Sequence, residues 1–146
     1  MKRSILALVT LTTFLTHNAS AFDFGSVMQA VAPMADAGLS TNPLVGNLTK
    51  NLGVTPTQAI GGSAALLNDA KKDMKPADFQ ALTTKMPQVG TLMAAAPAST
   101  GTVQSQFSAL GMKPEMIGKF TPFLLDYIKS GTTPGMMNLV QAALAN

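Results

Sequence analysis

Leu52-Gly53-Val54-Thr55-Pro56 and Leu110-Gly111-Met112-Lys113-Pro114 are the two stretches that decide the fold of this chain. In each, a glycine directly follows a leucine, and such a glycine commonly ends a helix in the left-handed conformation. The proline three residues later suits the first position of the next helix, where its missing N–H loses no hydrogen bond. Each stretch therefore predicts a tight link between two helices.

The two stretches are part of a longer similarity at a constant offset of 58 residues. Without a gap, Leu66-Leu67 falls on Leu124-Leu125, and Pro76 falls on Pro134. The shared unit predicts a lead-in helix, a link, a long helix with a leucine pair, and a shorter helix that begins at the second proline. Such a unit is a helical hairpin with a lead-in helix.

The repeat organises one predicted domain over residues 22–146. The repeat units cover about 48–86 and 106–144, and a low-complexity connector covers about 94–102. We favour duplication as the origin of the repeat. The alternative is chance similarity in the residues that begin and end helices. Two copies are too few for a solenoid, so we expect a closed, pseudo-symmetric bundle.

The predicted fold class is all-α, a bundle of five to eight short helices. Strand signals are weak, while Ala, Leu, Met, Gln and Lys favour helix. Helices are predicted at 43–51, 56–72, 76–86, 114–130 and 134–144, with weaker signals at 25–36, 88–95 and 101–110.

The long helices of the two units differ in side-chain size. Gly61-Gly62-Ser63-Ala64-Ala65 in the first unit predicts a flat face that receives Phe120 and Phe123 from the second. Pro122 lies inside the second long helix, where proline removes a backbone donor, and is expected to kink the helix after Gly118 or to split it.

The first 21 residues resemble a secretory signal peptide. Lys2 and Arg3 precede an apolar run over 5–15, and Ala19-Ser20-Ala21 supplies the small residues of a cleavage site. The apolar run is too short for a membrane span. We therefore expect export, to the periplasm or the medium, of a mature chain covering 22–146.

The composition of that mature chain limits the classes of function that it can have. Cleavage of the leader would remove the only His and the only Arg, and the chain has no Cys. Export thus leaves a domain without the side chains most used for acid/base catalysis, thiol chemistry and bidentate anion binding. Eight Lys then face seven acids, a net charge of +1, which does not indicate nucleic-acid binding.

Two arrangements of side chains invite a catalytic interpretation. Asp69 and Asp73 lie four residues apart on one helix face, but nearby lysines favour a solvated helix end over a hydrolase or calcium site. Ser63 and Lys71 are the components of a serine–lysine dyad, but they lie about two turns apart on the same helix. We therefore predict no catalytic residues and no enzyme.

Lysines and methionines suggest two binding interpretations. Lys71-Lys72-Asp73-Met74-Lys75 is compatible with an acidic surface, although lysines also favour the negative end of a helix dipole. Thioethers are soft ligands, so the second interpretation is copper(I) binding by Met112 with Met116 and by the pair Met136-Met137. Core packing is the favoured role of these methionines. We predict no metal site and no cofactor.

A short apolar stripe follows the expected cleavage site. It consists of Phe22, Phe24, Val27, Met28 and Val31. The stripe either packs on the bundle or remains a detachable interaction element.

The punctuation of the chain resembles the VcgC/VcgE family of bacterial proteins of unknown function. The resemblance covers roughly 48–144 and rests on the following segments: Leu52-Gly53-Val54-Thr55-Pro56-x-Gln58-Ala59-x-Gly61-Gly62, Pro76-Ala77-Asp78-Phe79, Ala94-Ala95-Ala96-Pro97, Leu110-Gly111-Met112 and Gly118-Lys119-Phe120. It implies export and a helical fold, and it carries over no catalytic or binding residue.

The sequence thus favours an exported, non-catalytic helical protein that binds a partner or the cell envelope, or associates with itself, through apolar helix faces. The alternative is a small carrier that holds a hydrophobic ligand or a soft metal in a cavity lined by Met and Phe. No transmembrane segment is expected in the mature chain.

Overall fold

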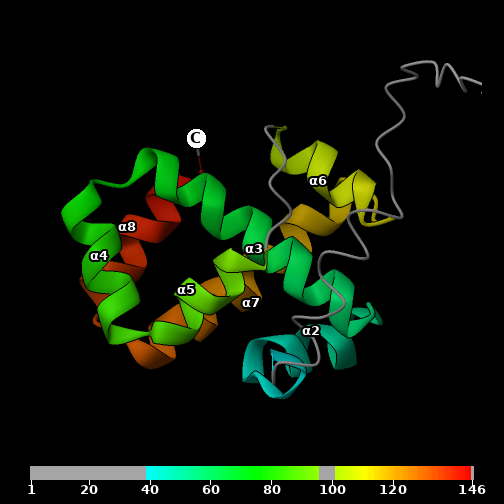
Figure 1. Cartoon of the computed structure of the whole chain (residues 1–146), viewed down its shortest axis with the longest axis horizontal. Coiled ribbons are helices and arrows are strands. Elements are labelled where there is room, and N and C mark those ends of the chain that lie inside the picture. Colours follow the sequence, from blue (N-terminus) through cyan, green and yellow to red (C-terminus); the bar gives the residue numbers. More distant parts are fainter. Residues whose placement is uncertain (1–38, 96–100, 146) are drawn as a thin grey trace, which may run out of the picture.

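The computed structural model describes residues 39–95 and 101–145, which form the helical bundle of Figure 1. The described elements are the short 3-10 helix η1 (Leu39–Thr41) and the helices α2 (Pro43–Leu52), α3 (Pro56–Asp73), α4 (Pro76–Lys85), α5 (Pro87–Ala94), α6 (Val103–Ala109), α7 (Glu115–Gly131) and α8 (Pro134–Leu144). The all-α fold class is confirmed, since none of these residues lies in a strand.

Seven of the eight predicted helices lie within the described residues, and each begins and ends within two residues of its predicted range. The helix predicted at 25–36 lies outside them, as do the leader and residues 96–100 of the connector. The agreement has a local cause, because prolines, caps and glycines fix helix ends through neighbouring residues alone.

The described helix starts differ in how they are capped. Asn42 Oδ1 accepts from the Leu44 N–H at 2.9 Å, and Thr55 forms a capping box with Gln58. Thr133, which precedes Pro134, makes no side-chain cap bond. Pro114 is the residue before α7 rather than its first residue, a difference of one position.

The two links adopt the predicted backbone. Gly53 and Gly111 have φ of 67° and 73°, the left-handed region that glycine enters without strain. They are equivalent in the 58-residue offset, and they are the two described residues with positive φ. Each link thus ends one helix and turns the chain toward the next.

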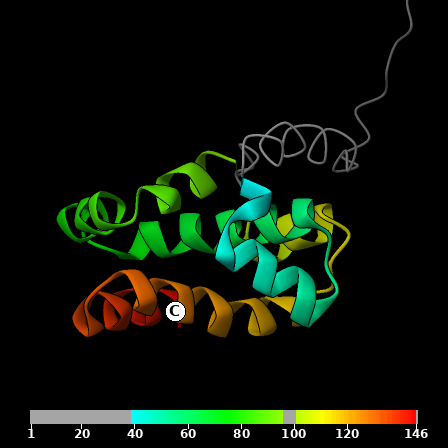
Figure 2. The same ribbon diagram turned by 90° about the horizontal axis from the view of Figure 1, so that it is seen from below.

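The helices form two layers, which Figure 2 shows edge-on. One layer contains α3, α4 and α5, and the other contains α7 and α8. The lead-in helices cross between the halves, since α2 packs on α7 and α6 packs on α3. No described helix is long and apolar enough to cross a bilayer.

The core centres on a close approach between the two long helices. A Cβ on Gly62 would lie 2.7 Å from Cε1 of Phe120 and 3.2 Å from Cζ of Phe107. The two rings meet edge to face at 5.1 Å, and both are buried. Phe120 therefore occupies the small-residue face as predicted. Phe107 of α6 supplies the second ring there, while Phe123 lies half-buried at the core edge.

Pro122 does not split α7, which runs continuously from Glu115 to Gly131. Proline leaves the carbonyl of Gly118 without its helical donor. Both residues are exposed, so water can reach that carbonyl. Thr121 Oγ1 donates to the Ile117 carbonyl at 2.9 Å, which satisfies the neighbouring position.

Candidate functional site

A surface groove lies between the start of α6 and the end of α8, and we call it the α6–α8 groove. It encloses about 540 Å³. Its lining residues come from four helices and from the residues before α6: Leu66, Asp69, Lys72, Gly101, Thr102, Val103, Gln104, Ile117, Thr121 and Leu144.

The groove combines an apolar floor with a polar rim. Leu66 is buried, and Val103 and Ile117 are half-buried. At the rim, Lys72 Nζ lies 3.2 Å from Asp69 Oδ1, with the two side chains 62% and 40% exposed. Because this pair is solvated, it adds little to stability and leaves both charges available to a partner.

The offset of 58 residues identifies the counterpart of this groove in the other half of the molecule. Asp69 corresponds to Tyr127, and Leu144 corresponds to Met86. Around Tyr127, α5, which begins directly after Met86, reaches α7 through Gln88. The equivalent positions therefore differ, because Tyr127 hydrogen-bonds to α5 and Asp69 lines an open groove.

A polar network joins α5 to α7 and to the residue before α2. The Tyr127 hydroxyl donates to Gln88 Oε1 at 2.6 Å, and Asn42 Nδ2 donates to the same oxygen at 3.0 Å. Asn42 Nδ2 also lies 3.1 Å from the Tyr127 oxygen. Three segments, before α2, in α5 and in α7, are joined by these contacts.

Burial on the long helices reflects the same difference. Ile60 and Ala64 on α3, the helix against which α5 packs, are fully buried. Their counterparts on α7, Gly118 and Pro122, are exposed. Among the described residues, which end one residue after α8, no helix follows α8 in the way that α5 follows α4.

A second, smaller pocket of about 250 Å³ lies between the two links, and we call it the link pocket. Its lining residues are Val54, Gln58, Gly111, Met112, Lys113, Glu115, Met116 and Lys119. Val54 and Met112 are equivalent in the repeat, so the pocket lies where the two halves meet. Gln58 Nε2 donates across it to the Leu110 carbonyl at 2.9 Å.

The pairs considered for catalysis do not form a reactive site in the described residues. Asp69 pairs with Lys72, and Asp73 is exposed at the end of α3. Ser63 is fully buried, and its hydroxyl has no hydrogen-bond partner there. Lys71 instead lies over the Phe79 ring, 5.4 Å from its centroid, so Ser63 and Lys71 are not brought together.

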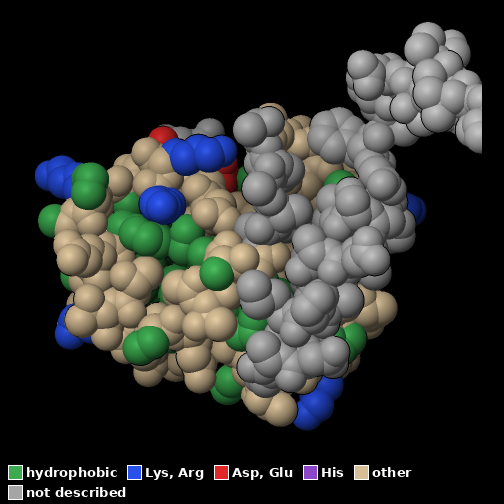
Figure 3. Space-filling view, viewed as in Figure 1, with side chains coloured by type: hydrophobic (Ala, Val, Ile, Leu, Met, Phe, Trp, Pro, Cys, Tyr) green, Lys and Arg blue, Asp and Glu red, His purple; other side chains and the backbone are tan. Residues whose placement is uncertain are grey.

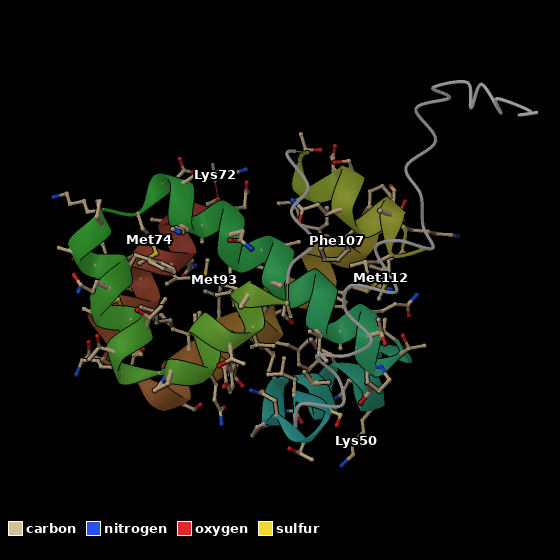
Figure 4. All side chains as sticks on the ribbon, viewed as in Figure 1. Lys50, Lys72, Met74, Met93, Phe107 and Met112 are labelled. Carbon is tan, nitrogen blue, oxygen red and sulfur yellow. The ribbon has the colours of Figure 1, made fainter. Side chains whose placement is uncertain are left out.

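The methionines divide between core and pocket. Met136 is buried in the core, while its neighbour Met137 is half-buried. Met112 and Met116 both line the link pocket. Neither groove is lined by both Met and Phe, which differs from the cavity expected of a carrier. Figure 4 shows Met112 near Phe107, at the α6 end of the bundle.

The lysine cluster at the end of α3 is dispersed in space. Lys71 lies on Phe79, and Lys72 pairs with Asp69. Figure 3 shows lysines spread around the visible face rather than gathered into one cationic patch.

Sequence reasoning missed both grooves and the network around Tyr127. Asn42 directly precedes a predicted helix, and nothing in the sequence near Gln88 or Tyr127 indicated that they would contact it. The available signal was the unequal pair Asp69 and Tyr127, one a charge and the other a ring, at equivalent repeat positions.

Comparison with known proteins gives a family and no activity. No curated protein and no solved structure matches the chain. The family described as protein of unknown function VcgC/VcgE (DUF2780) matches residues 10–102 and 98–145, which together cover most of the sequence and both grooves. The chain therefore belongs to the VcgC/VcgE family of proteins of unknown function.

Proposed function

We propose that this protein is an exported, non-catalytic binding module that receives an apolar helix of a partner in the α6–α8 groove. The observation that carries the proposal is the inequality of the two halves. In one half α5 bonds to this position through Gln88, whereas the other half has a groove with a buried leucine and half-buried aliphatic side chains beside a solvated ion pair.

The chemistry of the groove supports a helix as its ligand. Helix recognition uses an apolar groove that accepts side chains at spacings of three and four. The floor supplied by Leu66, Val103 and Ile117 is of this kind, and the rim offers one charge of each sign.

The absence of a catalytic role is part of the proposal. Every Asp and Glu of the described residues is at least partly exposed, and the one fully buried hydroxyl, that of Ser63, does not line either groove. Catalytic carboxylates usually owe their reactivity to burial in a cleft.

Export and binding are tested on the mature protein purified from the cell envelope and the medium. We expect its N-terminus at Phe22, and native mass spectrometry to show a bound partner that light scattering confirms as a complex. An intact Met1 on all recovered protein contradicts export.

A matched pair of variants locates the binding surface. Gln104 lines the groove and Gln80 lies on α4, and both are exposed. We expect Gln104→Trp to abolish the complex and Gln80→Trp to leave it intact. Loss of the complex in both variants, or in neither, contradicts binding at the groove.

A small carrier is the second candidate, favoured by the presence of Met112 and Met116 in the link pocket. Two thioethers can bind a soft metal, although Lys113 and Lys119 line the same pocket and oppose a cation. Titration with copper(I) under reducing conditions tests it. Binding no tighter than micromolar, or equal binding by Met112→Leu/Met116→Leu, ends this interpretation.

A further inference from the structure

We propose that this protein pairs with a second copy of itself through the outer face of α7, with the two α7 helices antiparallel about a two-fold axis at Pro122. The face consists of Glu115, Lys119, Pro122, Asp126 and Lys129, and we call it the α7 stripe. The inference goes beyond the proposed function, because none of these residues lines the α6–α8 groove, although Glu115 and Lys119 also line the link pocket.

The residues of the α7 stripe lie on one side of the helix. At about 100° per residue their positions fall within an arc of about 80°, and all five are exposed. The buried residues of α7, which are Phe120, Leu124 and Ile128, lie on the opposite side. The stripe therefore points away from the core, on a helix that Figure 2 shows at the edge of the bundle.

The centre of the α7 stripe lacks long side chains. Gly118, which adjoins it, and Pro122 are exposed, whereas their counterparts on α3, Ile60 and Ala64, are fully buried. Neither Gly118 nor Pro122 extends far from the backbone. A second helix can therefore approach to the interaxial distance of about 8–10 Å that packed helices adopt.

The order of charges on the α7 stripe selects a second copy as the partner. From the start of the helix the signs are minus at Glu115, plus at Lys119, minus at Asp126 and plus at Lys129. Read backward, the order has the opposite sign at every charged position. An antiparallel pair of identical helices therefore places opposite charges together, and a parallel pair would place each charge against itself.

The spacing of these charges matches as well as their sign. At a rise of about 1.5 Å per residue, Glu115 and Lys129 each lie about 10.5 Å from Pro122, on opposite sides of it. Lys119 and Asp126 lie about 4.5 Å and about 6 Å from it. Across the two-fold axis, Glu115 thus faces Lys129 of the second copy without an axial offset, and Lys119 faces Asp126 with an offset of about 1.5 Å.

Interactions within one helix do not account for the pattern. Glu115 and Lys129 also suit the helix dipole, but that effect is confined to the first and last turns, which leaves out Lys119 and Asp126. Pairs three or four residues apart could form along α7, yet in the part of the chain that the structure describes none of these four side chains makes an ion pair. All four charges are therefore available to a second copy.

The size of the α7 stripe predicts a weak dimer. A helix of 17 residues is about 25 Å long and about 10 Å wide, so its face is well below the roughly 800 Å² per partner of a standard interface. Exposed ion pairs contribute little each, and salt screens them. We expect a reversible dimer that forms at low ionic strength and weakens as salt is added.

Two variants with complementary charge test the pairing. Lys119→Glu/Lys129→Glu makes the stripe wholly acidic, and Glu115→Lys/Asp126→Lys makes it wholly basic. Sedimentation of the mature chain is followed from micromolar to millimolar concentration at low ionic strength. We expect each variant alone to dimerise about tenfold more weakly than the wild type, or less, because its facing charges repel. An equimolar mixture of the two should restore the dimer.

The control variant is Lys75→Glu/Lys85→Glu, at the two ends of α4. It changes the net charge as much as the acidic variant does, at exposed positions away from α7, and should leave the dimer intact. The proposal is overturned by a wild-type chain that stays monomeric throughout the series, or by a mixture that does not dimerise. Equal weakening in the control variant assigns the effect to net charge and overturns the proposal too.

A cysteine at the axis tests the register without changing a charge. The chain has no cysteine, and position 122 of one copy faces position 122 of the other. Under mild oxidation we expect Pro122→Cys to form a disulfide between two chains about tenfold faster than Gln80→Cys, because pairing raises the local concentration of the two thiols. Gln80 is an exposed residue of α4. Equal rates of cross-linking rule out the antiparallel register.

A groove variant separates this inference from the proposed function. Gln104 lies on α6 and lines the α6–α8 groove, so Gln104→Trp is expected to leave the dimer intact while it abolishes the partner complex. If Gln104→Trp abolishes the dimer, self-association occurs at the groove and pairing through α7 is wrong. If the dimer forms and no partner complex is found, the proposed function is wrong and the pairing stands.

Discussion

The two halves of the bundle, residues 48–86 and 106–144, share their helix punctuation but not their side-chain sizes. Gly53 and Gly111 have nearly the same φ, and each is followed by a long helix. Yet Gly62 and Phe120, which are equivalent in the offset, differ greatly in size, and they contact each other. Equivalent residues that meet between two halves cannot both be large, and two glycines would leave a void. Close packing therefore requires the difference.

The halves also differ in the surroundings of the equivalent positions Tyr127 and Asp69. Around Tyr127 the chain returns as α5, and Gln88 of α5 hydrogen-bonds to Tyr127 and Asn42. Around its counterpart Asp69 the α6–α8 groove stays open among the described residues. The halves thus share a backbone plan, and function, as proposed above, resides at the open groove. Common ancestry of the two halves remains a prediction.

Removing the large member of the contacting pair has the largest expected effect. Phe120→Ala should lower the free energy of unfolding by about 3–5 kcal/mol, because it leaves a cavity beside Gly62 and Phe107. Urea unfolding followed by circular dichroism measures it. Phe123→Ala, at the half-buried position, is the control, and equal losses contradict the packing described.

Enlarging the small member should cost less. Gly62→Leu overpacks a site where even a Cβ lies 2.7 Å from the Phe120 ring, and we expect a loss of about 1–3 kcal/mol. In the double variant Gly62→Leu/Phe120→Ala the losses should be less than additive, because the leucine enters the space vacated by the ring. Strict additivity in the four unfolding curves refutes the pairing.

The hydrogen-bond network around Gln88 should contribute less to stability, and only in the half that contains α5. Tyr127→Phe removes the hydroxyl that bonds Gln88 and contacts Asn42, so we expect a loss of about 1 kcal/mol. Asp69→Asn, at the equivalent position, breaks a solvated ion pair and should cost at most about 0.5 kcal/mol. Thermal melts of the two variants compare the halves, and equal shifts show that the network does not distinguish them.

The smallest expected change is a gain. Ser63 is fully buried and its hydroxyl lacks a partner among the described residues, so Ser63→Ala should stabilise the protein by about 1 kcal/mol. Thr121→Ala, at the equivalent position, removes a made hydrogen bond and should not stabilise. A lowered melting temperature for Ser63→Ala indicates that the hydroxyl has an acceptor after all.

Much of the fold followed from particular residues. Thr55 with Gln58 started α3, and Gly53 and Gly111 ended the helices before the links, because each acts on backbone groups within four residues of itself. Phe120 on the glycine face followed from comparing side-chain volumes at equivalent positions. The same reasoning assigned Phe123 to that face, because it considered one helix and could not place α6 beside it.

The sequence by itself determined, to within two residues, where each described helix begins and ends. It also determined that the two long helices approach closely, because these features depend on local backbone chemistry and on side-chain volume. Tertiary structure alone decided that Asn42, Gln88 and Tyr127 share hydrogen bonds, and that the surface around Asp69 stays open. The hydrogen bonds join residues that are separated by 39 to 85 positions in the sequence. Whether such residues meet depends on how whole helices cross and not on any pattern along the chain.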